Sequence, residues 1–289
     1  MIRNEEGVWT VCAGICFDPL KKVTFFRDSV VLKVTFTKDT RTMARFKVYL
    51  EYEGTRYSGW QVQKNARTIQ GEILNAAAKV FGTRDVDLQG SGRTDTGVHA
   101  QEQVAHFKTA SNIALFKLQQ ALDSLLPKDI RVTSASQTRV DFHSRYDAKE
   151  KTYRYSILNQ PQGDVFLRRY VYHFAPADLK IENMRRAAAM LVGRHDFSSF
   201  KINRDSQGSN NVRRIKNITV IRKGKLIIIE ITGSGFLHKM VRGIVGTLIE
   251  IGRGKLSIAA MKKILGAKSR KAAGPTAPAC GLCLMKVRY

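Results

Sequence analysis

Acidic residues are scarce in this sequence. Aspartate and glutamate together number 24 against 49 lysines and arginines, so the 289-residue chain carries a formal charge of +25. An excess of this size predicts a polyanionic partner, because cationic side chains release counterions on binding a polyanion and steer it toward the surface. The alternative is a merely basic soluble protein without such a partner.

Long apolar runs are also missing. The sequence has no stretch of ~20 apolar residues that would span a bilayer, and no basic amphipathic helix with an aromatic face. Two shorter apolar runs, 8–17 and 30–36, lack the charged, apolar and cleavage regions of a secretory signal. We therefore expect a cytoplasmic protein that does not act at a membrane.

Cysteine is rare, with four residues: Cys12, Cys16, Cys280 and Cys283. Zinc sites use the spacing of the last pair, and the first pair could complete a set of four ligands. No histidine accompanies either pair, however, and residues 282–289 have the pattern of a terminal strand. We expect reduced thiols and no bound metal.

The first 42 residues differ from the rest, because clear periodicity begins only at Met43. Met43 could be the true start, which would make residues 1–42 a mis-annotated extension. A genuine appended hairpin is the competing interpretation. We favour an artefact or a poorly ordered segment.

Residues 43–146 predict one α+β half. Strands are expected at 46–52, 86–89, 98–107 and 130–135, and helices after Thr68 and over 115–125, ended by Pro127. Thr68 is a suitable N-cap, and an apolar stripe follows it at Ile69, Ile73, Leu74, Ala77 and Val80. The order β-α-β-β-α-β is that of a ferredoxin-like (RRM-like) fold.

Residues 147–289 predict a second half of similar order. Strands are expected at 151–158, 215–222, 225–232 and 282–287, with a turn at Gly224, and helices at 181–192 and 238–251. The fold class is therefore α+β, with two ferredoxin-like halves whose antiparallel sheets lie side by side. We expect an active-site cleft between them, since ligands often bind between domains.

The segment from Gly90 to Ala100 carries the strongest chemical signal. Asp95 lies two residues after Arg93, between glycines that let the backbone turn sharply and a ligand come close. A nearby cation favours the ionised carboxylate, which is the form that acts as a nucleophile. The alternative is that Asp95 only stabilises a turn.

Three other segments join this interpretation. The strand carrying Tyr153 and Tyr155 places both rings on one face, and the helix after Gly233 carries Arg242 toward the cleft. A basic loop over 201–214 is expected to position RNA phosphates through Lys201, Arg204, Arg213 and Arg214. Each feature also has an alternative interpretation without a function: the tyrosines could pack in the core, Arg242 could form a surface ion pair, and the loop could simply be solvated.

Several short motifs, in their order along residues 43–289, resemble those of TruA-type tRNA pseudouridine synthases. The motifs lie at 57–61 (YSGWQ), 92–100 (GRTDTGVHA), 151–155 (KTYRY), 195–200 (HDFSSF) and 235–242 (GFLHKMVR). An ordered set of this kind is far more specific than any one motif. The resemblance does not include residues 1–42.

The resemblance implies an isomerase that converts uridine to pseudouridine at positions 38, 39 and 40 of the tRNA anticodon stem-loop. It implies a homodimer, tRNA as the partner, and no cofactor. Asp95 would be the nucleophile, Arg93 would help displace the target base, the Tyr153 ring would stack on the flipped uracil, and Arg242 would pair with the acid. A uracil in a stem must leave the stack to react, and an aromatic ring returns ~1–3 kcal/mol per stacked base.

Two rival functions remain open on the residues alone. Residues 95–97 read Asp-Thr-Gly, the tripeptide of dimeric aspartic proteases, but the proton-sharing carboxylate pair of those enzymes would be opposed by Arg93. A tandem RNA-binding module would explain the charge and the aromatic strands, but not an acid beside an arginine in a glycine-rich loop. His99 and His106 are expected to be structural.

Overall fold

The computed structural model describes residues 2–3, 9–10, 44–109, 113–175, 178–202 and 210–289. The first two stretches are the short antiparallel strands β1 (Ile2–Arg3) and β2 (Trp9–Thr10). The expectations for residues 1–42 otherwise fall outside the described residues. Residues 43–289 form a compact unit of their own, and their division at residue 146 stays a prediction.

The first half follows the predicted order of elements. It comprises β3 (Ala44–Tyr52), α1 (Ile69–Phe81), β4 (Asp87–Gly90), β5 (His99–Thr109), α2 (Leu115–Leu125) and β6 (Ile130–Gln137). The predicted N-cap is confirmed, because the Thr68 side chain accepts a hydrogen bond from the backbone N–H of Gly71. Gly82 ends α1 in the left-handed region that favours glycine.

The second half adds elements that the periodicity does not predict. It comprises β7 (Glu150–Leu158), β8 (Tyr172–His173), α3 (Ile181–Ala189), β9 (Gly193–Asp196), β10 (Val212–Lys223), β11 (Leu226–Gly233), α4 (Met240–Gly252), α5 (Ala260–Ala267) and β12 (Leu282–Arg288). Three 3-10 turns lie at Ser198–Phe200, Arg270–Ala272 and Ala279–Gly281. The predicted turn at Gly224 is confirmed between β10 and β11.

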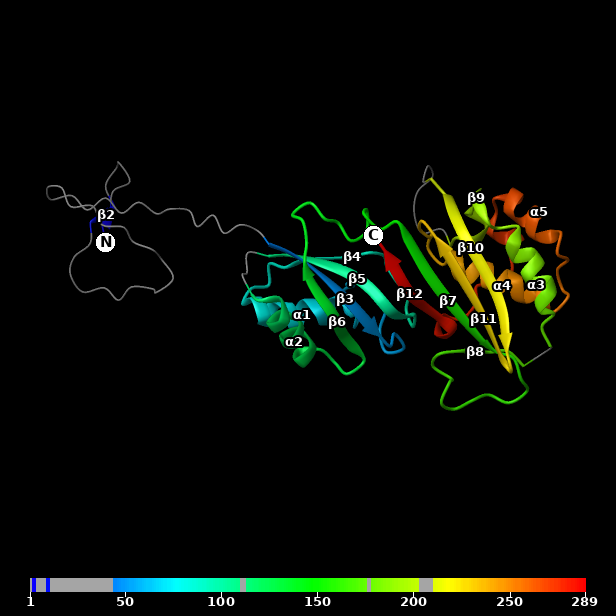
Figure 1. The fold of residues 1–289 in the computed structure, drawn as a ribbon, viewed down its shortest axis with the longest axis horizontal. Helices are drawn as coiled ribbons and strands as arrows, with labels where there is room; N and C mark the ends of the chain where they lie inside the picture. Colours follow the sequence, from blue (N-terminus) through cyan, green and yellow to red (C-terminus); the bar gives the residue numbers. More distant parts are fainter. Residues whose placement is uncertain (1, 4–8, 11–43, 110–112, 176–177, 203–209) are drawn as a thin grey trace. The chain divides into compact units, whose positions relative to one another are not determined.

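The strands of both halves join in one continuous sheet (Figure 1). Its order is β6-β3-β5-β12-β7-β11-β10-β9, with β4 beside β5 and β8 beside β7. The C-terminal strand β12 makes the junction: it runs antiparallel to β7 and pairs in parallel with β5 through Cys283–His99 and Leu284–Ala100. The last strand therefore holds β5 and β7, which carry residues near Asp95, at a fixed spacing.

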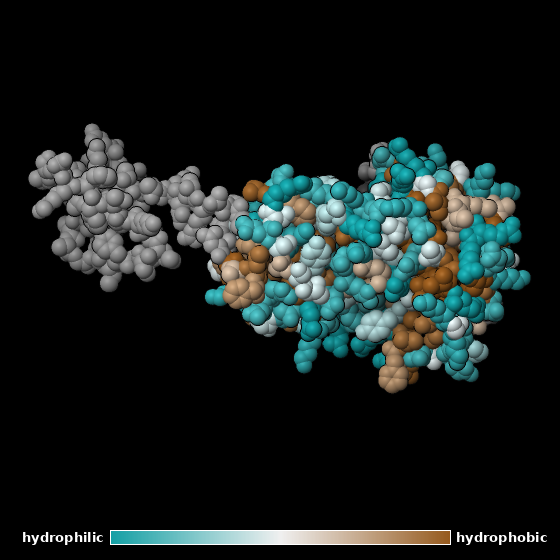
Figure 2. Space-filling model, viewed as in Figure 1, coloured by the Kyte–Doolittle hydropathy of each residue, from teal (hydrophilic) through white to brown (hydrophobic). Residues whose placement is uncertain are grey.

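Helices pack with the strands of their own half (Figure 1). Helix α2 contacts β6, whereas α3 contacts both α4 and β10. Apolar side chains from both halves form one buried cluster, because the continuous sheet carries the core across the junction. Hydrophilic side chains cover most of the face shown in Figure 2. Among the helices that the structure describes, none is long and apolar enough to cross a membrane.

Candidate active site

The Asp95 loop connects β4 to β5 and is held by the segment 57–61 (YSGWQ). The Thr94 carbonyl accepts a hydrogen bond from the Trp60 N–H at 3.0 Å, and the Tyr57 carbonyl accepts one from the Gly97 N–H at 3.4 Å. Gly59 has a φ of +86°, and a Cβ there would lie 2.6 Å from the Thr94 carbonyl oxygen. Only glycine fits this close approach, so the motif sets the position of the loop backbone.

Buried side chains support the same loop. The hydroxyls of Tyr52 and Thr94 lie 2.9 Å apart. Gln103 on β5 donates to the Gly92 carbonyl at 2.9 Å and accepts from the Ser91 hydroxyl at 2.7 Å. Polar groups that are buried and fully paired give a defined geometry, because any shift of the loop would leave one of them unsatisfied.

Both carboxylate oxygens of Asp95 face cationic or potentially cationic groups. Arg242 Nη1 donates to Oδ2 at 2.9 Å, and His238 Nε2 lies 3.4 Å from Oδ1. The Asp95 side chain is 18% exposed, which leaves it accessible while most of its hydration is lost. Partners at both oxygens hold this partly desolvated carboxylate in one orientation.

Arg242 is fixed by a second hydrogen bond. Its Nε donates to the Ala277 carbonyl at 2.7 Å, and the Arg242 carbonyl accepts from the Ala277 N–H at 3.1 Å. Arg242 lies in the first turn of α4, whereas Ala277 belongs to the segment before β12. The guanidinium is therefore aimed at Asp95 by two separate parts of the second half.

Tyr153 lies on β7 between β11 and β12, opposite Ile231 and Leu284. Its ring meets the Phe236 ring edge-on at 5.1 Å, and only 7% of the residue is exposed. Burial raises the pKa of the Tyr153 hydroxyl, and the nearby charge of Asp95 adds to the effect. The hydroxyl makes no hydrogen bond to any residue that the structure describes.

The aspartic-protease alternative finds no support in this geometry. That chemistry needs a second carboxylate to share a proton with Asp95. The partners of the Asp95 oxygens are instead Arg242 and His238, and no other carboxylate forms part of this group within the described ranges.

The family follows from comparison with known sequences. A family model described as tRNA pseudouridine synthase matches residues 49–147 and 187–289, which include Asp95, His238 and Arg242. The chain belongs to the tRNA pseudouridine synthase family.

Two relatives with similar sequences agree with this assignment. The tRNA pseudouridine synthase A of Halalkalibacterium halodurans is 46% identical over 240 residues, covering 83% of this chain and 90% of the relative. That of Acetivibrio thermocellus is 44% identical over 247 residues, covering 86% and 100%. Among solved structures, a Cbf5–Nop10–Gar1 complex matches with a TM-score of 0.33 and 11% identity, over 82% of this chain and 57% of that one.

The other predicted site residues are more dispersed. Arg93 is exposed and has no ion-pair partner among the residues described. Lys201 donates to the Asn211 side chain at 2.7 Å, and Arg213 donates to the carbonyls of Asn210 and Val212. Arg214 is exposed on β10, and Arg204 lies outside the described residues. Their roles as RNA contacts stay predictions.

Sequence reasoning assigned no role to two residues at this site. His238 lies four residues before Arg242, but it precedes α4, which begins at Met240, so helical spacing does not identify it. Lys151 donates from Nζ to the Ser91 carbonyl. Burial and, to a lesser extent, the charge of Arg145 lower the pKa of Lys151 to about 8. Lys151 opens the motif 151–155 (KTYRY), but no sequence pattern indicates that its ammonium group is buried.

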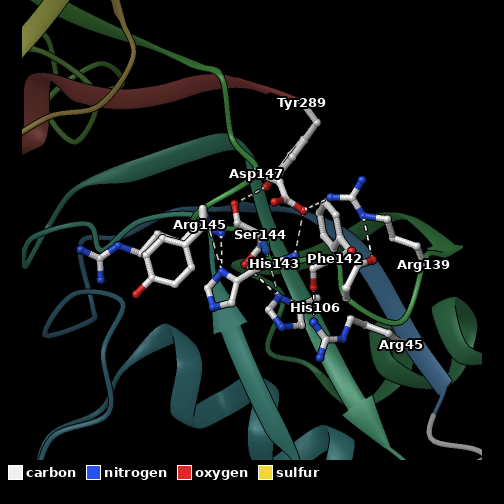
Figure 3. Close-up of polar contacts among 11 residues, drawn as sticks. Arg45, His106, Arg139, Phe142, His143, Ser144, Arg145, Asp147 and Tyr289 are labelled. Carbon is white, nitrogen blue, oxygen red and sulfur yellow. Dashed lines mark hydrogen bonds and ion pairs between the residues drawn. The ribbon is translucent and has the colours of Figure 1, made fainter.

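His99 and His106 are structural, as predicted. The Gly54 N–H donates to His99 Nδ1 at 3.0 Å, and His99 Nε2 lies 2.8 Å from the Arg169 carbonyl. His106 contacts Ser144 of the segment 139–147, shown in Figure 3. Both imidazoles are almost completely buried.

The cysteines give no metal site in the part of the chain that the structure describes. Cys280 and Cys283 are free thiols, and no three His, Cys, Asp or Glu side chains are grouped there as metal ligands. Burial raises the pKa of the Cys283 thiol to about 11. Cys12 and Cys16 lie outside the described residues.

Proposed function

We propose that this protein isomerises uridine to pseudouridine at positions 38, 39 and 40 of the tRNA anticodon stem-loop. The observation that carries the proposal is the oriented, accessible carboxylate of Asp95, held by Arg242 and His238 in a chain of this family. The formal charge of +25 is suited to a tRNA substrate.

The reaction rearranges bonds within one nucleotide. The bond between N1 of uracil and C1′ of ribose breaks, the base turns, and a bond forms between C5 and C1′. C5 loses its proton and N1 gains one, so the atoms balance without a cofactor or an external reductant. The site must therefore hold a detached base and exclude water until the new bond forms.

Asp95 is the residue that acts on the flipped-out nucleotide. Its carboxylate either attacks the sugar or removes a ribose proton, and both routes need the ionised form. Arg242 orients the carboxylate through the 2.9 Å hydrogen bond. His238 limits the rotation of the carboxylate by its position at the other oxygen.

Tyr153 and Arg93 act on the base before the chemistry begins. The uridine leaves the stack, and the exposed guanidinium of Arg93 takes the vacated place. The Tyr153 ring is preorganised by Phe236 and receives the uracil beside Asp95. The hydroxyl of Tyr153 has no partner among the described residues and is available to the base.

The proposal extends to the assembly. We propose that the two halves are ferredoxin-like units flanking an active-site cleft, and that the protein works in the cytoplasm as a homodimer holding tRNA by the anticodon arm. The strand order of each half supports the first part, since β6-β3-β5-β4 and β12-β7-β11-β10 repeat the same arrangement. Lys201, Arg204, Arg213 and Arg214 would contact the RNA backbone.

Release of tritium from tRNA labelled at C5 of uridine tests the function. We expect the wild-type protein to release tritium, and Asp95→Asn to bind the same tRNA with an unchanged Kd while releasing none. Asp85→Asn is the matched control, because Asp85 is exposed on the loop after α1 and should release tritium normally. Undiminished release by Asp95→Asn would overturn the role of Asp95, and no release by the wild type would overturn the function.

A further inference from the structure

A group of three cations adjoins the Asp95 loop without belonging to its chemistry. Lys151, near the start of β7, hydrogen-bonds through Nζ to the Ser91 carbonyl. A Cβ on Gly92 would lie 3.1 Å from the same Nζ. The ammonium group therefore lies against the chain only a few residues before Asp95.

Arg145 and Arg213 complete the group. Arg145 follows Ser144, whose hydroxyl donates to the carbonyl of Gln89, two residues before the Ser91 carbonyl that binds Lys151. The positive charge of Arg145 lowers the pKa of both Lys151 and Arg213, although burial is the larger cause for each. The Arg213 guanidinium is near the loop that leads into α4, since its Nε lies 4.0 Å from the position of a Cβ on Gly235. Lys151 pairs with Gly233 at the end of β11, and Arg213 lies near Gly235, two residues further along the chain.

No carboxylate neutralises these three cations in the described ranges. The nearest acids in sequence have other partners: Asp147 pairs with Arg139, and Glu150 pairs with Lys216 and Arg288. Like charges held together and partly desolvated raise the free energy of the unliganded protein. A bound anion would remove this cost, and a phosphate group suits both guanidinium and ammonium donors.

The backbone that carries Arg145 is rigid. The His143 imidazole accepts hydrogen bonds from the backbone N–H groups of Arg145 and Tyr146, and the Ser144 hydroxyl donates to the Gln89 carbonyl. Figure 3 shows the Arg145 side chain extending away from this network, and its guanidinium lies 5.8 Å from the centroid of the neighbouring Tyr146 ring. A preformed cation of this kind binds a ligand with little loss of backbone entropy.

We propose that Arg145, Lys151 and Arg213 form a phosphate-binding subsite for the tRNA backbone next to the uridine at Asp95. The inference rests on the proposed function and adds a backbone contact to it. Its role is to set the register of the RNA, because phosphate contacts position a nucleic acid without reading its bases.

The salt dependence of tRNA binding tests the subsite. For Arg145→Gln, we expect Kd to rise roughly tenfold at moderate salt, and the slope of log K against log salt to become shallower by about 0.7–0.9. At saturating tRNA, kcat should stay within about twofold of wild type, because a lost backbone contact weakens ground and transition states alike. Arg145→Lys should restore most of the slope.

Lys225→Gln is the charge-matched control. Lys225 is an exposed lysine in the β10–β11 turn, at the opposite end of β11 from Gly233, and its loss should leave the slope unchanged. An unchanged slope for Arg145→Gln would overturn the subsite, as would a slope change of equal size in Lys225→Gln. Because the wild type must release tritium in the same experiment, failure of the proposed function is recognised separately.

Discussion

Arg242 Nη1 and Asp95 Oδ2 lie 2.9 Å apart although 147 residues separate them in the sequence. Asp95 is carried by the first half and Arg242 by the first turn of α4 in the second half. Because the two side chains meet only when both halves are assembled on the common sheet, neither half contains a complete site. The continuous sheet is therefore what brings Asp95 and Arg242 together.

Arg242→Lys should impair chemistry more than binding. A lysine ammonium cannot both reach Asp95 and donate to the Ala277 carbonyl with the fixed fork of a guanidinium. We expect tritium release to fall roughly 100-fold and the free energy of unfolding to fall by about 1–2 kcal/mol. Single-turnover release and urea unfolding measure the two effects.

Arg253→Lys controls for a general effect of the arginine replacement. Arg253 follows the end of α4 and pairs with Glu250 at 3.2 Å, an interaction that lysine can replace. Its activity should equal that of the wild type. If Arg242→Lys were as active as this control, Arg242 would have no role beyond packing.

Tyr153→Phe separates the ring of Tyr153 from its hydroxyl. The ring remains packed on Phe236, so tRNA binding and stability should be unchanged. We expect kcat to fall at least about tenfold, because the Tyr153 hydroxyl, which has no hydrogen-bond partner among the described residues, is proposed to contact the base. Steady-state tritium release gives kcat, and filter binding gives Kd.

Tyr155→Phe is the matched control on the same strand. The Tyr155 hydroxyl donates to the Pro278 carbonyl at 2.8 Å, so its loss should cost about 1 kcal/mol of stability and leave kcat unchanged. Wild-type turnover by Tyr153→Phe would restrict Tyr153 to stacking.

Local sequence signals predicted most elements of this fold. The Thr68 cap and the turn at Gly224 depend on neighbouring residues only, and both were predicted correctly. The start of α4 was not: the helix begins at Met240 instead of residue 238, because Lys239 adopts a left-handed conformation. His238 therefore lies in the loop before α4 and not on the helix. Helical periodicity cannot show that its side chain reaches Asp95.

Long-range pairing was beyond the reach of sequence patterns. The alternation in 282–287 predicts a strand and its buried face, but it does not say that β12 enters between β5 and β7. Burial of Lys151 was equally hidden, because the ammonium group lies against Ser91, which belongs to another segment. Strand identity is local information, whereas strand neighbours and buried charges are set by the assembled core.

Gly246→Ala tests whether the packing of α4 positions Arg242. A Cβ at Gly246 would lie 1.7 Å from the Pro275 carbonyl oxygen, so the segment that carries Ala277 must move away from the helix. We expect the free energy of unfolding, measured in urea, to fall by about 1–3 kcal/mol. The rate of tritium release should fall as well, because Arg242 would lose its support from Ala277. Gly266→Ala, in α5 with open space around it, should instead gain up to about 1 kcal/mol and keep full activity.

His106 should make the protein sensitive to mild acid. Burial, followed by the charges of Arg45 and His143, lowers the pKa of His106 to about 4 from an ordinary value of 6.5. Its Nδ1 accepts a hydrogen bond from the Ser144 N–H at 3.2 Å, an interaction that protonation at Nδ1 would break (Figure 3). Between those two pH values the unfolded chain binds a proton that the folded protein excludes.

The sign of the effect follows from this difference. The unfolded state binds more protons across the window, so the free energy of unfolding rises with pH and falls as pH drops from 6.5 toward 4. The contribution is about 3 kcal/mol over the whole window.

His106→Gln, which keeps an acceptor for Ser144 without titrating, should lose much less stability than the wild type when urea unfolding is compared at both ends of the window. His173→Gln, a change at an exposed histidine, should keep the wild-type difference, and equal acid sensitivity in His106→Gln would show that other groups cause it.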